Sequence, residues 1–349
     1  MNTLVQISET SIGSGRPPFV VAELSGNHNG SIDRAIALIE AAKQAGADAV
    51  KLQTFTADTL TIDHAGPEFR ISGGLWDGRR LYDLYQEAST PWEWHPVLFA
   101  KARQLGLAVF STPFDPSAVD FLETLECPAY KIASFEIVDL PLIRKAAATG
   151  KPLIMSTGIA NLGEIQEAVQ AAREGGCRDL VLLHCISSYP APAEDYNLLT
   201  IANLRETFGV PVGLSDHTHG TAVAVASIAL GSCLVEKHMT LARSDGGPDA
   251  AFSLEPDEFR TLVQDCRTAY SALGRVHYDE KGCEAGSAIF RRSLYFVADV
   301  QEGEVIKPSH VRSIRPGFGL LPKHLDSVIG RRATSRITRG TPVSWSLLK

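Results

Sequence analysis

Short apolar runs recur along the chain, and longer segments with a different spacing separate them. Eight runs are rich in aliphatic residues: 19–25, 49–54, 107–114, 129–134, 152–158, 180–185, 211–217 and 233–239. The segments between them, such as 32–47 and 162–176, place apolar residues at helical spacing and carry Gly near their ends. Eight strand–helix units within about 270 residues predict a (β/α)8 TIM barrel, an α/β fold. A doubly wound open sheet is the alternative, but no glycine-rich nucleotide-binding loop follows any run.

The pattern changes after residue 278. Helical periodicity stops, and short strand-like pieces follow between turns that contain Gly or Pro. We therefore predict a barrel domain at 1–280, a linker at 281–290 and a small β-rich domain at 291–349. In the small domain, the turn-rich RPGFG (315–319) carries Arg315. That residue is either a donor to an anion or a hydroxyl, or an ordinary solvated arginine.

Composition narrows the classes of function. The chain has 349 residues, 44% of them hydrophobic, a formal net charge of -7 and no run of Lys or Arg. We therefore expect neither nucleic acid nor a membrane as a partner. The first residues lack a basic and an apolar leader segment, and the six cysteines show no C-x-x-C spacing. These features predict a cytoplasmic protein with reduced thiols.

Polar residues gather where the predicted strands end. In a (β/α)8 barrel this end is the active-site face, so residues from distant parts of the chain are expected to meet in one pocket. The polar residues at these ends are Glu23, Ser25, Lys51, Gln53, Ser111, Thr112, Lys131, Ser134, Ser156, Thr157, His184, Ser215, Asp216, His217, Glu236, Lys237 and His238.

Three ionisable residues interrupt the last apolar run, CLVEKHMTL (233–241). Burying each of them unpaired would be costly, so we interpret the run as an eighth strand that delivers its charges to the barrel mouth. Because side chains alternate along a strand, Glu236 and His238 share one side, as do Ser215 and His217. A single buried histidine is usually a satisfied core residue. Two histidines on neighbouring strands instead predict a divalent-metal site with room for water or substrate.

Lysines and hydroxyls at the same strand ends indicate an anion site. We interpret Lys51 and Lys131 as anion-binding or Schiff-base residues, and peripheral ion pairs are the structural alternative. Four hydroxyl residues join them: Thr112, Ser134, Ser156 and Ser215. Together they suit a small ligand that bears phosphate and carboxylate groups. A metal-independent Schiff-base aldolase and a non-catalytic sugar-binding protein are the alternative functions.

Nine ordered motifs resemble those of the sialic acid synthases. They are AELSGNHNG (22–30), GADAVKLQTF (46–55), FSTPFD (110–115), YKIASFE (130–136), MSTGIA (155–160), CISSYPAP (185–192), GLSDHT (213–218), EKHMTL (236–241) and RPGFG (315–319). The resemblance covers nearly the whole chain and implies a (β/α)8 barrel followed by an antifreeze-like (SAF) domain. Within that family, the segment 71–95 is similar to that of the pseudaminic acid synthases rather than the N-acetylneuraminate or legionaminate synthases. It lies in the long connection after the second strand, where we expect a sugar-contacting loop.

The resemblance implies a metal-dependent transferase. Phosphoenolpyruvate would condense with 2,4-diacetamido-2,4,6-trideoxy-L-altrose to give pseudaminic acid and phosphate, with cleavage of the C–O bond of phosphoenolpyruvate. N-acetylneuraminate or legionaminate synthesis by the same chemistry is the alternative. The implied cofactor is Mn2+, Co2+ or Mg2+. The resemblance also implies a domain-swapped homodimer in which Arg315 completes the site of the neighbouring subunit.

The resemblance further implies a role for each site residue. His217 and His238 would hold the metal. Phosphoenolpyruvate would be bound by Lys51, Thr112, Lys131, Ser134, Ser156 and Ser215. The sugar and the reacting carbons would be surrounded by Glu23, Tyr189, Asp249 and Arg315. Ser187 stands where the neuraminate enzymes carry Asn, which argues against a strict neuraminate specificity. Glu23 is either the base that orients the attacking water or a hydrogen-bond partner of a sugar hydroxyl.

Overall fold

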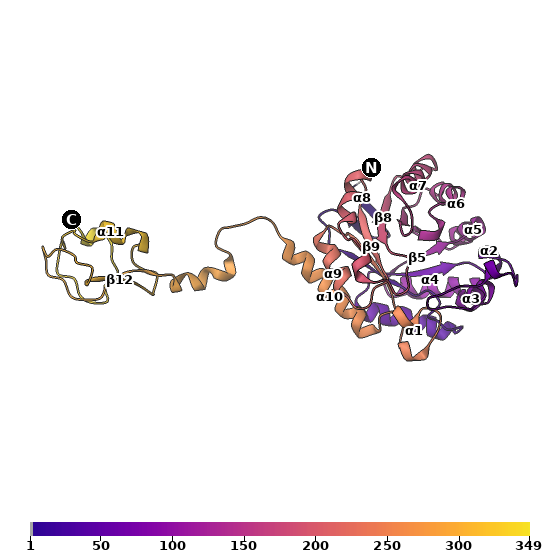
Figure 1. Cartoon of the computed structure of the whole chain (residues 1–349), viewed down its shortest axis with the longest axis horizontal. Coiled ribbons are helices and arrows are strands. Elements are labelled where there is room, and N and C mark those ends of the chain that lie inside the picture. Colours follow the sequence, from indigo (N-terminus) through magenta and orange to yellow (C-terminus); the bar gives the residue numbers. More distant parts are fainter. Residues whose placement is uncertain (1–2) are drawn as a thin grey trace. The chain divides into compact units, whose positions relative to one another are not determined.

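The computed structural model describes residues 3–349, which form two compact units (Figure 1). The first unit ends at Gly274, directly after α10 (Pro256–Leu273), and the second comprises Arg275–Lys349. Each unit has its own hydrophobic core. A 3-10 helix at Gly282–Phe290, without buried residues, precedes the first strand of the second unit. The domain limits predicted at residues 280 and 290 stay predictions.

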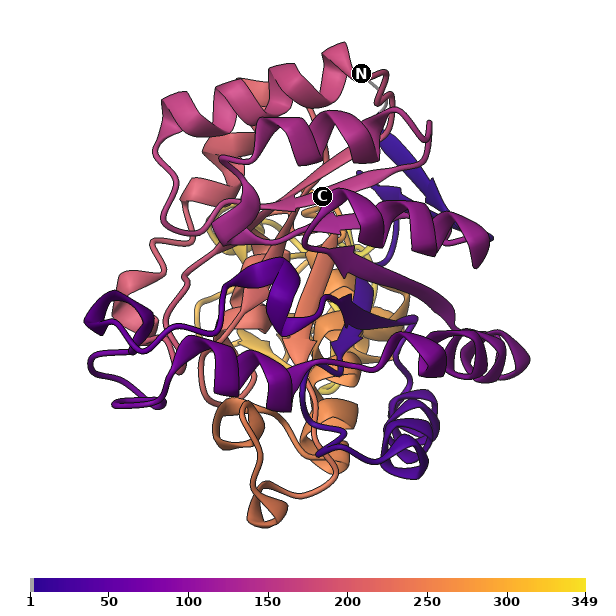
Figure 2. The same cartoon turned by 90° about the vertical axis from the view of Figure 1, so that its right-hand side faces the viewer.

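The first unit is a closed barrel of parallel strands in the order β10-β3-β4-β5-β6-β7-β8-β9. The strands are β3 (Phe19–Glu23), β4 (Ala49–Thr54), β5 (Ala108–Pro113), β6 (Tyr130–Ile132), β7 (Leu153–Ser156), β8 (Leu180–Cys185), β9 (Val212–Asp216) and β10 (Leu234–His238). The helices that follow them are α1 (Ile32–Ala45), α4 (His95–Gln104), α5 (Pro116–Thr124), α6 (Leu140–Ala147), α7 (Leu162–Glu174), α8 (Thr200–Phe208), α9 (Ala222–Ala229) and α10. Figure 2 shows these helices around the strands. Each of the eight predicted runs contains one strand, so the predicted barrel is confirmed.

The helices begin and end where the sequence provides capping groups. At the start of α1 the hydroxyl of Ser31 accepts a hydrogen bond from the backbone N–H of Arg34. The helix ends at Gly46, whose φ of 88° is the left-handed conformation that glycine adopts without strain. At the start of α7, Asn161 and Glu164 form a reciprocal capping box. Such caps explain why the two helices predicted from spacing are found within two residues of their expected limits.

An N-terminal hairpin precedes the barrel and was not predicted. The strand β1 (Leu4–Ile7) pairs antiparallel with β2 (Thr10–Gly13). Val5, Ile7 and Ile12 are fully buried and belong to the barrel core. These residues alternate with polar ones over only a few positions, which is too short a pattern to distinguish a strand from an irregular segment.

The connection after β4 is the longest in the barrel and contains two short helices, α2 (Ala57–Leu60) and α3 (Leu81–Ala88). Between them, residues 70–80 form a hairpin-like loop closed by an isolated bridge between Arg70 and Arg80. We call residues 70–80 the flap. The backbone N–H groups of Ile71 and Gly78 donate to the carbonyls of Arg79 and Ile71, both at 2.9 Å. These bonds give the flap a defined shape.

The second unit is a small β-rich domain. Its strands β11 (Ser293–Phe296) and β12 (Val311–Ile314) pair antiparallel, and isolated bridges and the short helix α11 (Leu325–Val328) complete it. The loop that carries Arg315 is tied to β11, since Ser293 Oγ donates to the carbonyl of Pro316 at 2.7 Å. A Cβ at Gly319 would lie 2.1 Å from the carbonyl oxygen of Leu294, so only glycine fits there.

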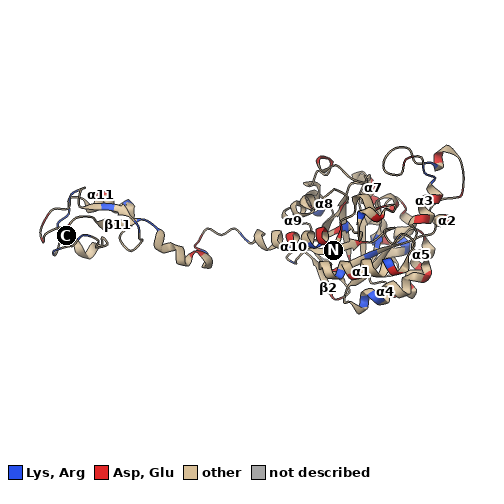
Figure 3. Ribbon diagram, turned by 90° about the horizontal axis from the view of Figure 1, so that it is seen from below, with Lys and Arg blue, Asp and Glu red and all other residues tan. Residues whose placement is uncertain are grey.

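Positions of Lys and Arg and of Asp and Glu are interspersed along the ribbon of the barrel (Figure 3). Within residues 3–349 no helix has both the length and the apolar character needed to span a bilayer.

Candidate active site

The pairing of the barrel strands determines which side chains face the barrel interior. It aligns Glu23 with Lys51, His238 with Glu23, and Glu236 with Ser215. Residues paired in this way point to the same face of the sheet. Following this register around the barrel, the inward set at the strand ends is Glu23, Lys51, Gln53, Thr112, Lys131, Ser156, Cys185, Ser215, Glu236 and His238.

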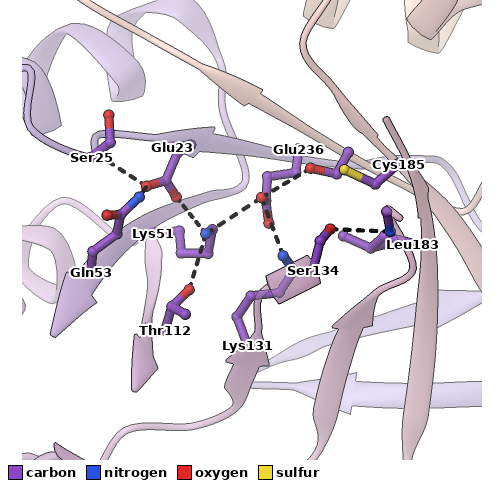
Figure 4. A network of polar contacts seen from close by, with 12 residues as sticks. Glu23, Ser25, Lys51, Gln53, Thr112, Lys131, Ser134, Leu183, Cys185 and Glu236 are labelled. Carbon is purple, nitrogen blue, oxygen red and sulfur yellow. Dashed lines mark hydrogen bonds and ion pairs between the residues drawn. The ribbon is translucent and has the colours of Figure 1, made fainter. Parts of the chain in front are cut away.

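Buried charges from strands on different sides of the barrel meet in a chain of alternating sign (Figure 4). Lys51 Nζ lies 2.7 Å from Glu23 Oε2 and 3.4 Å from Glu236 Oε1. Lys131 Nζ lies 3.5 Å from the same Glu236 oxygen. Gln53 Nε2 donates to Glu23 Oε1 at 2.9 Å. Because β4 and β6 do not adjoin β10, these contacts cross the interior of the barrel.

Burial and the neighbouring charges shift the pKa values of these four groups. Burial raises the pKa of Glu23, and Lys51 offsets only part of the effect. For Glu236 burial acts in the same direction, but Lys131 and Lys51 outweigh it and lower the pKa. Burial lowers the pKa of Lys131, whereas Glu23 and Glu236 overcome burial at Lys51 and raise its pKa. The shifts favour an ionised Glu236 and a cationic Lys51, whereas burial weakens the charged form of Lys131. Two lysines beside buried carboxylates are a suitable lining for a small anion.

The polar side chains between the inward positions point away from the barrel interior. Lys237 Nζ lies 2.7 Å from Asp216 Oδ2 and donates to the carbonyl of Thr218, in a pair that is almost fully buried. The prediction that the eighth strand delivers all its charges to the mouth is therefore wrong for Lys237, because strand alternation turns it outward. His184 is likewise outward and is hydrogen-bonded to the carbonyl of Tyr196, as a structural core histidine.

His217 and His238 lie together at the mouth, with ring centroids 5.4 Å apart. His217 Nδ1 donates to the carbonyl of Ile186 at 2.8 Å, and His238 Nδ1 is hydrogen-bonded to Ser25 Oγ at 3.2 Å. Burial lowers the pKa of His238 well below its ordinary value, and the nearby His217 adds to this effect. Within the described part of the chain these bonds use Nδ1 and leave Nε2 available for a ligand, as in histidines that bind metals.

His217 and His238 are the two protein ligands that the described residues offer to a metal at this place. Among residues 3–349 no group of three or more His, Cys, Asp or Glu side chains is arranged to hold an ion. Burial lowers the pKa of His217, but the neighbouring Cys185 outweighs this effect and raises it. An imidazole whose Nε2 carries no proton is a good ligand for a divalent cation, so the pair fits a cation whose other ligands are water or substrate.

The predicted hydroxyl residues lie around the charge chain, and some lack partners. Thr112 Oγ1 accepts from Lys51 Nζ at 3.1 Å, and Ser134 Oγ accepts from the backbone N–H of Gly158 at 3.1 Å. Ser215 Oγ donates to Glu236 Oε1 at 3.3 Å. Within residues 3–349 the buried atoms Ser156 Oγ, Ser187 Oγ and Glu236 Oε2 have no hydrogen-bond partner. A bound ligand or water would satisfy this hydrogen-bonding capacity.

A cavity of about 530 Å³ opens next to this cluster and is lined in part by Ser187, Tyr189, His238 and Asp249. This volume is typical of sites for small ligands. The ring of Tyr189 lies 4.4 Å from that of His217, so it stands beside the two histidines. Asp249 Oδ2 accepts weakly from the backbone N–H of Gly26 at 3.4 Å, and burial raises its pKa. The structure thus brings together all predicted site residues of the first unit.

Arg315 lies in the second unit, on the exposed loop anchored at β11. Its predicted role in an active site therefore stays a prediction.

Two residues that were expected at the strand ends, but were given no role in the site, prove central to it. Glu236 contacts both lysines, and Gln53 donates to Glu23. Because side chains alternate along a strand, the positions of His238 and Lys51 already indicated that Glu236 and Gln53 face the same pocket.

Two other residues were not predicted. Glu136, whose pKa burial raises to about 7, and Trp76 both line the cavity. Trp76 stands on the flap and Glu136 ends a short 3-10 helix after β6, and the sequence pattern gives no sign of where a side chain in such a connection points.

A closed barrel with charged strand ends that adjoin a ligand-sized cavity defines a (β/α)8-barrel enzyme. Comparison with known proteins identifies its relatives. The model of the NeuB family matches residues 38–278, and that of the SAF domain matches residues 291–349. The chain therefore belongs to the NeuB family, and the predicted membership of the sialic acid synthases with a C-terminal SAF domain is confirmed.

Relatives along nearly the full length of the chain include several synthases. The chain is 44% identical to a pseudaminic acid synthase of Helicobacter pylori over 331 residues, which cover 94% of this chain and 97% of the relative. It is 36% identical to an N,N'-diacetyllegionaminic acid synthase of Legionella pneumophila, with 95% of each chain covered. A solved N-acetylneuraminic acid synthetase of Leptospira borgpetersenii has a TM-score of 0.73 at 28% identity, with 82% of this chain and 95% of that chain covered.

Proposed function

We propose that this enzyme condenses phosphoenolpyruvate with 2,4-diacetamido-2,4,6-trideoxy-L-altrose to give pseudaminic acid and phosphate. One observation carries the choice of product: the chain is 44% identical to a pseudaminic acid synthase but 36% identical to a legionaminic acid synthase, each over nearly its whole length. The buried charges at the strand ends support the use of an anionic co-substrate.

In this proposal phosphoenolpyruvate lies among the inward residues of the barrel. Lys51 and Lys131 bind its phosphate and carboxylate, and in the free enzyme Glu23 and Glu236 neutralise these ammonium groups. The ligand would also take up the hydrogen-bonding capacity of the hydroxyls Thr112, Ser134, Ser156 and Ser215. The partnerless Ser156 Oγ supports this placement.

We assign the sugar to the adjoining cavity, because its walls contain Ser187, Tyr189, Asp249 and His238. Fixing the sugar there and phosphoenolpyruvate beside it would hold the two reacting carbons in contact. His217 and His238 would hold Mn2+, Co2+ or Mg2+, which supplies Lewis acidity towards the sugar aldehyde.

The proposed reaction forms one C–C bond and breaks one C–O bond. C3 of phosphoenolpyruvate attacks the aldehyde carbon, the aldehyde oxygen takes a proton, and positive charge develops at C2. Water adds at C2 and loses a proton, and the hemiketal phosphate then expels phosphate to leave the ketone. Glu23 is suited to accept the proton of this water, because burial raises its pKa and Lys51 and Gln53 fix its orientation. A hydrogen bond to a sugar hydroxyl is the other role open to Glu23.

We also propose that the enzyme is a domain-swapped homodimer in which Arg315 acts on the neighbouring barrel. Loops after the barrel strands expose large apolar side chains that do not line the cavity, among them Val138 at 60% and Ile159 at 72% exposure. A second subunit would cover such residues, and Arg315 is exposed and free to donate to a sugar hydroxyl.

Phosphate release tests this function directly. The purified enzyme is supplied with phosphoenolpyruvate, a divalent cation and one of three sugars: the altrose derivative, its legionaminate-pathway counterpart or N-acetylmannosamine. We expect the highest kcat/KM with the altrose derivative. A higher value with either other sugar would overturn the proposed product, and the absence of phosphate release with all three would overturn the proposed reaction.

A further inference from the structure

The cavity beside the charge cluster is lined by two unlike sets of residues. The polar groups come from the barrel strand ends and the loops that follow them, for example Gln53, Ser187 and Asp249, and these loops also add the apolar residues Phe114, Ala133, Phe135 and Pro248. The connection between β4 and α4 contributes almost only apolar side chains: Phe55, Leu60, Ile71, Leu75, Trp76, Leu84, Tyr85 and Ala88. The flap residues among these are Ile71, Leu75 and Trp76.

The flap is held at the cavity by a contact that is distant in sequence. Trp76 Nε1 donates to the carbonyl of Pro248 at 2.8 Å, which ties the flap to the loop after β10. The indole ring lies 5.6 Å from the ring of Tyr189, and Tyr189 stands beside His217. The flap is thus a fixed apolar wall that reaches towards the candidate reacting centre.

We propose that this wall selects the acceptor sugar by accepting methyl groups where other sugars carry hydroxyls. The inference rests on the proposed function, which places the sugar in this cavity with its aldehyde carbon beside phosphoenolpyruvate. The far end of the sugar then points away from the charge cluster, and we assign it to the flap. The proposed sugar has a methyl group at C6 and acetamido methyls at C2 and C4, whereas N-acetylmannosamine has hydroxyls at C4 and C6. A hydroxyl held against Leu75 and Trp76 would lose water without gaining a hydrogen bond.

The expected difference in kcat/KM between the two sugars follows from the discrimination that an apolar pocket can achieve. Such a pocket discriminates between ligands that differ by one small group by about 10- to 200-fold. We therefore expect kcat/KM for the 6-deoxy altrose derivative to exceed that for its 6-hydroxy form by about 10-fold or more.

The experiment measures the ratio of kcat/KM for the 6-deoxy sugar to kcat/KM for its 6-hydroxy form in wild type, Leu75→Ser, Trp76→Ala and a control variant. Leu75 is 45% exposed, so its replacement spares the fold, and the serine adds a hydroxyl to the wall. The matched control is Ile62→Ala, which removes an apolar side chain of the same connection that is 58% exposed and does not line the cavity. Because each ratio compares two sugars on one preparation, a reduced fraction of active enzyme cancels.

We expect the ratio to fall to within about 3-fold of unity in Leu75→Ser and Trp76→Ala, and to stay at the wild-type value in Ile62→Ala. An unchanged ratio in both cavity variants, or an equal fall in the control, would overturn the proposal. If wild type uses N-acetylmannosamine and not the altrose derivative, the proposed function fails. The same comparison with N-acetylmannosamine and its 6-deoxy form then tests the flap independently.

Discussion

Replacing Lys51 with Met tests the charge chain, because Lys51 contacts two buried carboxylates at once. The ammonium group lies 2.7 Å from Glu23 and 3.4 Å from Glu236, and the side chains of all three residues are at most 5% exposed. The substitution Lys51→Met keeps a similar volume but leaves the carboxylates without this cation. Removing one partner of a buried ion pair costs about 3–5 kcal/mol, so we expect the free energy of unfolding to fall by that amount.

The loss should depend on pH in a defined direction. Burial already raises the pKa of Glu23 above 4.5, and removal of Lys51 would raise it further. A folded carboxyl with a raised pKa binds a proton more readily than the unfolded chain, so its contribution favours folding at low pH and is lost as the pH rises. The deficit of Lys51→Met should therefore be largest at pH values above the raised pKa and should shrink as the pH falls towards 4.5.

Lys237→Met is the matched control, since Lys237 forms an equally buried pair that faces out of the barrel. Urea unfolding followed by circular dichroism should show a comparable loss of stability in both variants. Only Lys51→Met should raise the KM for phosphoenolpyruvate, by about 10-fold or more for a lost charged hydrogen bond. A wild-type KM in Lys51→Met, or an equal rise in Lys237→Met, would refute the assignment of the inward charges to this substrate.

Two further predictions concern the metal and the second unit. Chelation should abolish turnover, and addition of Mn2+, Co2+ or Mg2+ should restore it. The variants His217→Ala and His238→Ala should lose the bound metal with little change in circular dichroism. Full activity in excess chelator would contradict the proposed metal dependence. Mixing inactive Arg315→Ala and His238→Ala subunits should return about a quarter of wild-type activity after random pairing, because in a swapped dimer one site then carries both lesions and the other none. No recovery in demonstrated heterodimers would reject the swapped arrangement.

Two regular patterns explain why much of the fold and of the site could be predicted from the sequence: the succession of strands and helices, and the alternation of side chains along each strand. Eight apolar runs with helical segments between them predicted the barrel, and the strand ends contain Lys51, Lys131 and His238 as expected. The alternation of side chains along a strand, applied strictly, would also have excluded Lys237 from the barrel mouth, since it lies between two inward residues on β10.

The remaining features depend on contacts that no local pattern encodes. Trp76 reaches the cavity because it bonds to Pro248, which is 172 residues away in the sequence. The carboxyl of Glu136 acquires a pKa of about 7 only because the folded chain buries it. The direction of a strand side chain follows from periodicity and could be predicted from the sequence. The direction of a loop side chain depends on tertiary packing and could not be predicted.

Phosphoenolpyruvate with heavy oxygen at the bridging position gives the most direct test of the proposed reaction. It is incubated with the altrose derivative, a divalent cation and the enzyme, and both products are examined by nuclear magnetic resonance and mass spectrometry. We predict a sugar acid identical to pseudaminic acid, containing the carbons of both substrates, and heavy oxygen recovered in the phosphate. Heavy oxygen retained in the sugar acid, or phosphate released without a new C–C bond, would contradict the proposed condensation.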